Sequence, residues 1–205
     1  MKELAILGAS GHGKVVADAA QCIGWLVSFY DDDPAAGKNL GPWQIKGTFN
    51  DLLESGCDYD GCIVGIGNNQ IRLQKSKILL AHKIPLVSIV HPTATVSKYA
   101  QLKSGSVVMA GAVVNADANL GLACIVNTSA SVDHDCMIGN GVHISPGAHL
   151  GGEVEVGECS WIGIGASVRH QIRIGDHVMV AAGAAVVKDV DDNIIVAGVP
   201  ATRLR

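Results

Sequence analysis

A histidine beside a carboxylate is the most chemically suggestive pair in this 205-residue chain. His134 is followed directly by Asp135. An adjacent carboxylate can orient an imidazole ring and stabilise its protonated form, so the pair is a candidate general base. Whether it can act depends on the elements that position it, and the sequence around it is strongly periodic.

The stretch from Val90 to about Asp191 repeats with a period of six. Every sixth residue from Val90 to Val186 is Val, Leu or Ile, and the residue four positions after each of these is compact. A helix cannot keep this period on one face, because 3.6 residues per turn does not divide six. A short strand and a turn in each hexapeptide can keep it, which is typical of a parallel β-helix.

The repeat resembles the left-handed parallel β-helix of the hexapeptide acyltransferases, in which three hexapeptides form one triangular coil. That resemblance implies that residues 18 apart stack on one another. His134 then lies at a corner outside the prism, and Gly152 stacks on it. A glycine there lets a ligand approach the backbone and its N–H closely. Acyl transfer needs such an arrangement, because a base removes a proton while an N–H donor stabilises the oxyanion.

Composition argues against several classes of protein. Lys and Arg total 15 against 19 acidic residues, the net charge is −4 and no basic run is present, which disfavours nucleic-acid binding. No apolar run reaches the length of a membrane span, and we expect no signal peptide at the N-terminus. Of the six cysteines none forms a CxxC pair, and Cys124 and Cys136 fall at the small inward position of the repeat. Reduced thiols and a cytoplasmic location are therefore expected.

The pattern of residues 1–83 predicts a Rossmann-like α/β domain of three to four strands. A β-helix domain is expected over residues 84–205. A buried strand over residues 3–7 runs into a Gly-rich turn, and a helix should follow from about Gly13 to Cys22. The next strand ends in Asp31 and Asp32. Rossmann-type domains use this order to hold a nucleotide, with a phosphate at the helix N-terminus and a ribose hydroxyl on the acid.

Two sharper nucleotide-binding motifs are absent from the Gly-rich turn. Gly13-Lys14 imitates the end of a P-loop, but Val15 stands where the Mg²⁺-binding hydroxyl belongs. The glycines also fall as GxxGxG rather than as the dinucleotide pattern GxGxxG. A nucleotide-like anion at this turn is predicted from the order of the elements alone.

The end of a further strand should complete this nucleotide site. After a loop-rich stretch with a short helix near residues 50–55, a buried strand over residues 62–66 runs into Gly67, and another helix covers about residues 70–83. The carboxyl ends of parallel strands line one crevice in open α/β sheets. We therefore expect Gly8–Gly13, Asp31, Asp32 and Gly67–Arg72 to share one site.

Three further histidines lie within the repeats. His143 is half a coil from His134, so the two can meet only between chains packed side by side, which predicts a homotrimer with sites at its interfaces. His149 and His170 are predicted to be solvated surface residues. His170 is two coils from His134, a spacing that raises a zinc site of the γ-class carbonic anhydrase kind. That class carries a further histidine where this chain has Gly175, so no metal is expected.

Short motifs are spread over nearly the whole chain. They are Gly-Ala-Ser-Gly-His-Gly at residues 8–13, Tyr-Asp-Asp at 30–32, Gly-Ile-Gly-Asn-Asn-Gln-Ile-Arg at 65–72, Asn127-Thr128-Ser129, His134-Asp135-Cys136, the segment His143–Ala148, and Gly-Val-Pro-Ala at 198–201. Together they resemble the sialic acid O-acetyltransferase-like family. That family includes the bacterial N-acetyltransferases that act on UDP-linked 4-amino-4,6-dideoxy sugars.

This resemblance implies an acetyl-CoA-dependent N-acetyltransferase of bacterial glycan biosynthesis, acting on a UDP-4-amino-4,6-dideoxy-N-acetylhexosamine. It implies that His134 is the catalytic base and that Asp135, where family members often carry Glu, raises its basicity. The residues that match acetyl-CoA contacts are His143, Gly152, Ile164 and Ala182. Those that match nucleotide-sugar contacts are Ser10, Gly11, His12, Asp31, Asp32 and Gly67.

Two alternatives remain open from the sequence. One is an O-acetyltransferase acting on sialic acid or a related sugar, and the other is a non-catalytic nucleotide-sugar-binding module that uses the repeats to oligomerise. An exposed base beneath a glycine favours an enzyme, and the Gly-turn with its acid favours a nucleotide-linked acceptor. Cys136 occupies an inward position, so no nucleophile stands beside His134. The transfer is therefore expected to be direct, without an acyl-enzyme.

Overall fold

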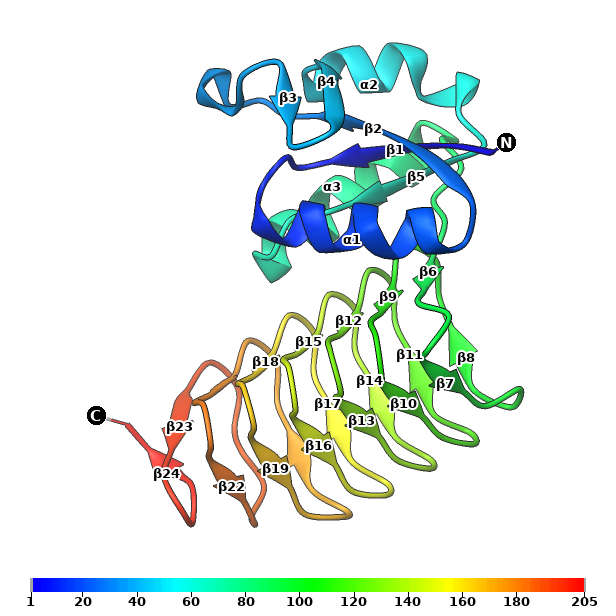
Figure 1. Ribbon diagram of the computed structural model, residues 1–205. Coiled ribbons are helices and arrows are strands. Elements are labelled where there is room, and N and C mark those ends of the chain that lie inside the picture. The colour runs from blue at the N-terminus through cyan, green and yellow to red at the C-terminus, as the bar shows by residue number, and fades with distance from the viewer. Residues whose placement is uncertain (1, 205) are drawn as a thin grey trace. The chain divides into compact units, whose positions relative to one another are not determined.

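The chain folds into two compact units that divide between Pro92 and Thr93. A computed structural model describes residues 2–204. Within these residues the helices all belong to the first unit, whereas the second consists of short strands stacked in successive coils (Figure 1).

The first unit is built on an open sheet with the strand order β3-β4-β2-β1-β5. Its strands are β1 (Lys2–Leu7), β2 (Trp25–Tyr30), β3 (Asn39–Leu40), β4 (Trp43–Gly47) and β5 (Gly61–Val64). All neighbouring strands run parallel except β3 and β4. The apolar run Leu4–Leu7 is buried, as expected for a parallel strand covered on both faces. Strands β3 and β4 lie in the stretch that the sequence predicted as loop, which makes the sheet larger than expected.

Helices connect these strands at the expected places. They are α1 (Gly11–Cys22), α2 (Phe49–Ser55) and α3 (Asn69–Ala81), with short 3₁₀ turns at η1 (Pro34–Ala36) and η2 (Gly56–Asp58). Helix α3 begins where the Asn68 side chain accepts a hydrogen bond from the backbone N–H of Ile71. After α3, the backbone of Cys62 in β5 bonds to Pro85 and Val87, so this connecting segment extends the edge of the sheet.

Three parallel sheets form the faces of the coiled stack. The eight-stranded sheet contains β6 (Ile89–Val90), β9 (Val107–Val108), β12 (Ile125–Val126), β15 (His143–Ile144), β18 (Trp161–Ile162), β21 (Met179–Val180), β23 (Ile195–Ala197) and the antiparallel β24 (Thr202–Arg203). The six-stranded sheet contains β7 (Thr95–Val96), β10 (Val113–Val114), β13 (Ser131–Val132), β16 (His149–Leu150), β19 (Ser167–Val168) and β22 (Ala185–Val186). The five-stranded sheet contains β8 (Gln101–Leu102), β11 (Asn119–Leu120), β14 (Met137–Ile138), β17 (Glu155–Val156) and β20 (Arg173–Ile174).

The register of these sheets confirms a coil of three hexapeptides. Val114 pairs with Val132, and Val132 pairs with Leu150, so each partner lies 18 residues further along the chain. The repeated aliphatic residues, such as Ile144 and Ile162, are fully buried inside the coils. From Val108 to Val186 these residues are all buried, and they supply the apolar surface that stabilises the stack.

Each corner between two faces is a tight turn. The fourth residue of most hexapeptides has a positive φ; it is glycine in Gly141 (φ 67°) and Gly147 (φ 64°) but aspartate in Asp135 (φ 59°). Glycine adopts this left-handed conformation without strain, and Asp and Asn tolerate it better than most other residues. The corners therefore accept a few functional side chains in place of glycine.

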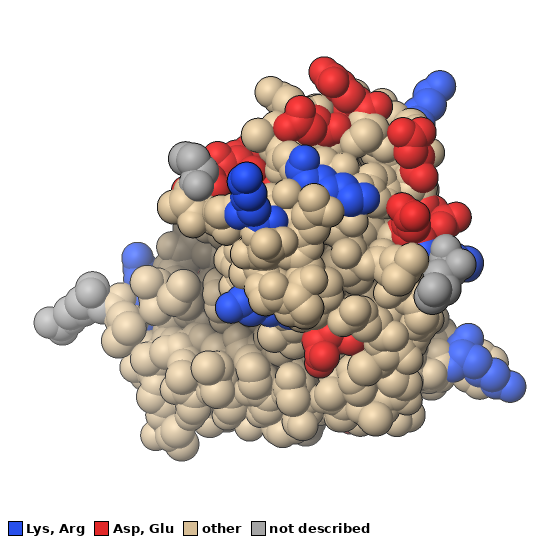
Figure 2. Space-filling model, turned by 45° about the horizontal axis from the view of Figure 1, so that its top comes forward, with Lys and Arg blue, Asp and Glu red and all other residues tan. Residues whose placement is uncertain are grey.

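In the view of Figure 2, the charged side chains gather on the upper part of the surface, and the lower part shows few of them. Lys and Arg side chains are interspersed there with Asp and Glu side chains. This pattern fits the small net charge of the chain, −4.

We expect Ile144→Ala to destabilise the fold strongly. The side chain is fully buried between coils, and its loss leaves a cavity that typically costs about 2–5 kcal/mol. Ile71→Ala removes the same side chain from a position that is 44% exposed and should change stability by less than about 0.5 kcal/mol. Chemical denaturation of both variants at one protein concentration measures the difference. Equal stabilities would contradict the assignment of the core.

Candidate active site

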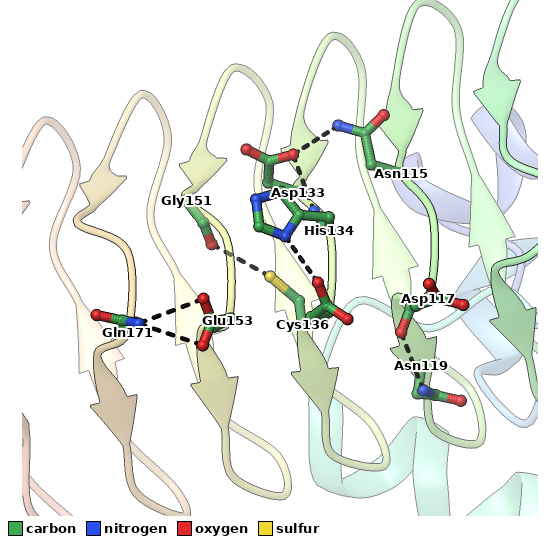
Figure 3. A network of polar contacts seen from close by, with 10 residues as sticks. Asn115, Asp117, Asn119, Asp133, His134, Cys136, Gly151, Glu153 and Gln171 are labelled. Atoms are coloured by element: carbon green, nitrogen blue, oxygen red, sulfur yellow. Dashed lines mark hydrogen bonds and ion pairs between the residues drawn. The ribbon is translucent and has the colours of Figure 1, made fainter.

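His134 lies at a corner between the six-stranded and five-stranded sheets. It belongs to the turn that joins β13 to β14, and its side chain is 54% exposed. Its Nδ1 lies 2.8 Å from Oδ2 of Asp135, as Figure 3 shows. The shorter acid therefore reaches the ring directly, and Nε2 is left to face a ligand.

Gly152 stacks on His134 in the next coil, as the sequence predicted. A Cβ atom built on Gly152 would lie 2.5 Å from Nε2 of His134, so only glycine leaves room for the ring. The backbone N–H of Glu153 donates to the carbonyl of His134 at 2.9 Å. None of the hydrogen bonds formed within residues 2–204 uses the N–H of Gly152. A basic nitrogen and a backbone donor thus lie together at one corner.

The surroundings of His134 raise its pKa above the usual value. The largest cause is the hydrogen bond that the ring donates to Asp135. The charges of Asp133, Asp135 and Glu153 also raise the pKa, while desolvation opposes them. A more basic imidazole is a better proton acceptor once it is deprotonated. Neighbouring carboxylates therefore make His134 a stronger base.

A shallow groove runs past His134 towards the C-terminal coils. Its lining is Asp133, His134, Gly151, Gly152, Glu153, Val168, Arg169 and His170. His170, which the sequence predicted to be an ordinary surface residue, shares this groove at two coils' distance from His134. The groove therefore carries acids near the candidate base and cationic or titratable side chains further along.

His143 lies on a different face from His134. It belongs to β15 of the eight-stranded sheet, is only 7% exposed, and its Nε2 lies 3.1 Å from Nδ2 of Asn127. Its ring packs against Trp161, with centroids 4.4 Å apart, and Trp161 Nε1 donates to Ser145 Oγ at 2.7 Å. The sequence analysis quoted Asn127 and Ser145 only as motif residues and did not single out Trp161. Asn127 lies 16 residues before His143 and Trp161 lies 18 after it, so offsets of about one coil could have found both.

Ile164 and Ala182 lie one coil apart at another corner. This corner joins the eight-stranded to the six-stranded sheet, and the backbone N–H of Gly183 donates to the carbonyl of Ile164 at 2.8 Å. Ile164 is 61% exposed. Within one chain, the residues predicted to bind acetyl-CoA are therefore divided between two corners and one face.

The predicted nucleotide site gathers at the carboxyl ends of β1, β2 and β5. The backbone N–H of Ala9 donates to Asp31 Oδ2 at 2.5 Å, which joins the Gly-rich turn to the end of β2. A Cβ atom on Gly13 would collide with the Gly8 carbonyl, and one on Gly65 would lie 2.9 Å from Gly13 Cα. Backbone contacts this close explain the glycines of the turn.

The N-terminal end of α1 and the neighbouring Asp32 differ in the hydrogen bonds that they form within the chain. Ser10 is the N-cap residue of α1 but forms no side-chain cap hydrogen bond, and a Cβ on Gly11 would meet open space. Asp32 is held by the backbone N–H of Phe49 at 2.7 Å and by Lys75 Nζ at 3.3 Å. The helix start is thus open, whereas Asp32 contacts α2 and α3 and keeps 57% of its side chain exposed.

A buried arginine shapes the turn after β5. Arg72 is 1% exposed, and its guanidinium donates to the carbonyls of Ile66 and Gly67 at 3.0 and 2.9 Å. Burial, and then the Arg72 charge, lower the pKa of His12 to about 4. His12 is therefore a neutral imidazole at physiological pH, suited to a hydrogen bond rather than to an ion pair.

No group of three or more His, Cys, Asp or Glu side chains in residues 2–204 is arranged to hold a metal ion. In the same part of the chain, no helix combines the length and apolarity needed to cross a membrane. All six cysteines are free thiols.

Two protein-family models match the chain. The PglD N-terminal domain matches residues 3–79, and the bacterial transferase hexapeptide (six repeats) matches residues 153–188. A curated relative, UDP-N-acetylbacillosamine N-acetyltransferase of Bacillus subtilis (strain 168), is 37% identical over 121 residues. That match covers 54% of this chain and about half, 52%, of the relative.

Solved structures match over the whole chain. The acetyltransferase domain of PglB from Neisseria gonorrhoeae FA1090, in complex with acetyl coenzyme A, is 44% identical with a TM-score of 0.95, and the match covers 99% of both chains. A mutant of perosamine N-acetyltransferase from Caulobacter crescentus, in complex with CoA and GDP-perosamine, is 35% identical with a TM-score of 0.94. That match covers 100% of this chain and 98% of the other.

We expect Asp135→Asn to lower the pKa of His134. The hydrogen bond that the ring donates to the Asp135 carboxylate is the largest cause of the raised pKa, and a neutral amide cannot stabilise the protonated ring in the same way. Asp117→Asn is a matched control, because Asp117 occupies the same left-handed corner position one coil earlier. NMR titration of the His134 ring measures both effects. An unchanged His134 pKa in Asp135→Asn would refute the pairing.

Proposed function

Since this chain belongs to the family of hexapeptide sugar acetyltransferases with a PglD-type N-terminal domain, we propose that it transfers the acetyl group of acetyl-CoA to the amine of a nucleotide-linked amino sugar. The favoured acceptor is a UDP-4-amino-4,6-dideoxy-N-acetylhexosamine used in bacterial glycan biosynthesis. The name of the Bacillus relative supports UDP as the nucleotide. The Caulobacter N-acetyltransferase, in complex with CoA and GDP-perosamine, supports a nucleotide-linked sugar as the acceptor.

One observation carries the mechanism: Nδ1 of His134 is held by Asp135 at 2.8 Å while Nε2 faces Gly152. The acceptor amine attacks the thioester carbonyl as Nε2 of His134 removes its proton. The N–H of Gly152 donates to the oxyanion. As the tetrahedral intermediate collapses, the carbon–sulfur bond breaks, and the CoA thiolate leaves and takes up a proton. The products are the amide and CoA thiol.

The transfer is direct in this proposal. Cys136, the cysteine closest to His134 in sequence, is fully buried, its Sγ lies 3.2 Å from the Gly151 carbonyl, and burial raises the pKa of its thiol. A nucleophilic cysteine needs an exposed thiolate with a lowered pKa. The environment of Cys136 is the opposite, which supports attack by the acceptor itself.

Two sets of residues bind the substrates in this proposal. Acetyl-CoA is bound by His143, Gly152, Ile164 and Ala182. The nucleotide-sugar is bound by Ser10, Gly11, His12, Asp31, Asp32 and Gly67 of the Rossmann-like domain, over residues 1–83. The open N-terminal end of α1 supports a phosphate contact there, because its backbone N–H groups attract an anion.

The proposed assembly is a homotrimer of left-handed β-helices, acting in the cytoplasm. The separation of His134, His143 and Ile164 over two corners and one face supports it, because a neighbouring chain can bring such residues to one cofactor. The proposed partners are acetyl-CoA and the nucleotide-linked amino sugar. The proposed reaction involves neither a metal ion nor a nucleic acid.

The decisive assay measures thiol release from acetyl-CoA in the presence of candidate acceptors. UDP- and GDP-linked 4-amino sugars, sialic acid and the acceptor-free control are compared, and products are identified by mass spectrometry. An amide on a nucleotide-linked sugar is the expected result. An ester would favour an O-acetyltransferase, and tight nucleotide-sugar binding without thiol release would favour a non-catalytic binding module.

His134→Ala should lower kcat by about 10²–10⁴-fold, the usual contribution of a general base. The KM for acetyl-CoA should change little, because the ring is proposed to act on the acceptor proton. Steady-state kinetics measure both constants. Cys136→Ala is the control and should keep most of its turnover. A folded but inactive Cys136→Ala, or an acetyl-enzyme trapped without acceptor, would refute direct transfer.

Mixed assemblies test the interface. If His134 of one chain works with His143 of a neighbour, His134→Ala and His143→Ala chains co-assembled in one trimer recreate intact sites. Activity should therefore rise well above that of either variant alone, as measured on purified mixed trimers. A stable monomer in analytical ultracentrifugation would refute the assembly.

A further inference from the structure

Two side chains outside the His134–Asp135 pair tie His134 to the preceding coil. Oδ1 of Asp133 accepts a hydrogen bond from the backbone N–H of His134 at 2.8 Å. The same oxygen accepts a second hydrogen bond from Nδ2 of Asn115, also at 2.8 Å. Asn115 lies one coil earlier, 18 residues before Asp133, and the chain of contacts is visible in Figure 3.

The following coil forms a hydrogen bond with the backbone carbonyl of His134. The carbonyl of His134 accepts the backbone N–H of Glu153 at 2.9 Å. The Glu153 carboxylate in turn accepts Nε2 of Gln171 at 3.2 and 3.3 Å. Both backbone groups of His134 are therefore held by hydrogen bonds, although the residue stands at an exposed corner.

We propose that Asn115 is a positioning residue for His134 that acts through Asp133. The inference rests on the proposed role of His134 as the base. An unsupported Asp133 side chain could rotate away from the His134 N–H, because both lie in an exposed turn. Asn115 fixes the carboxylate from a neighbouring coil and so fixes the backbone that carries the ring. Catalytic groups need such support, since displacements below 1 Å reduce rates.

The charges around His134 make this arrangement sensitive to pH. The His134 N–H and then Asn115 lower the pKa of Asp133, so Asp133 is an anion at neutral pH. The other groups that face His134 are Asp135 and Glu153. Arg169 and His170 line the same groove. Replacing the Asn115 donor with an acid therefore adds a negative charge directly against Asp133.

Asn115→Asp provides the sharpest test. At neutral pH two carboxylates face each other, the bond is lost, and kcat should fall roughly tenfold, the order expected for one hydrogen bond to a charged group. The KM for acetyl-CoA should stay unchanged. As the pH falls, the pair takes up one shared proton and the bond returns, so the deficit relative to the natural chain should shrink.

Asn119→Ala is the matched control. Nδ2 of Asn119 donates only to the carbonyl of Asp117, in the same coil as Asn115, at 3.1 Å. Its removal should leave kcat and the pH profile unchanged. A loss as large as that of Asn115→Asp would overturn the proposal.

An NMR measurement separates this inference from the proposed function. In Asn115→Ala the Asp133 carboxyl should titrate at a higher pKa, and the His134 amide signal should shift with it. Both are measured without substrate. If the natural chain fails to acetylate any acceptor while these shifts appear, the function is wrong but the positioning network stands. If neither the Asp133 pKa nor the His134 amide changes, the network itself is refuted.

Discussion

The parallel stacking of residues 18 apart is the constraint on which this molecule depends. Backbone hydrogen bonds such as those from Asp133 to Leu150 (3.2 Å) and from Gly151 to Val168 (3.0 Å) lock each coil onto the next. Neighbouring parallel strands lie only about 4.8 Å apart, so a side chain reaches an adjacent coil but rarely a second one. The contacts of Asn115 with Asp133, and of Gly152 and Glu153 with His134, join neighbouring coils for this reason. The arrangement of groups around His134 therefore depends on the 18-residue register of the coils.

The second unit was largely predictable because its buried residues recur at a fixed interval in the sequence. The aliphatic period located the buried positions and the corners, and the interval of 18 placed Gly152 on His134. What the period could not supply was the conformation of polar side chains. Asn115 and Asp133 are also 18 apart, yet nothing in the residue types indicated that one oxygen would serve both Asn115 and the His134 backbone.

The first unit was less predictable because its elements follow no such interval. The short strands β3 and β4 carry too few apolar residues to stand out from loop. An arginine in α3 would ordinarily be expected at the surface, since a buried charge is costly. Arg72 is nevertheless buried, because the carbonyls of Ile66 and Gly67 satisfy its guanidinium. The convergence of the Gly-rich turn with Asp31 was anticipated from strand order, whereas the neutral His12 depends on burial that only the folded structure reveals.

The left-handed backbone of Asp135 has a consequence for how this corner can evolve. At φ 59° a residue with a short side chain that can bond its own backbone is favoured, and a longer acid is less suited. Asp135 nevertheless reaches the His134 ring, so among the acids local conformational preference and function favour the same residue. A change to glycine would relax the backbone while removing the acid. Selection for a more stable corner would thus oppose selection for a stronger base, and aspartate is the compromise between them.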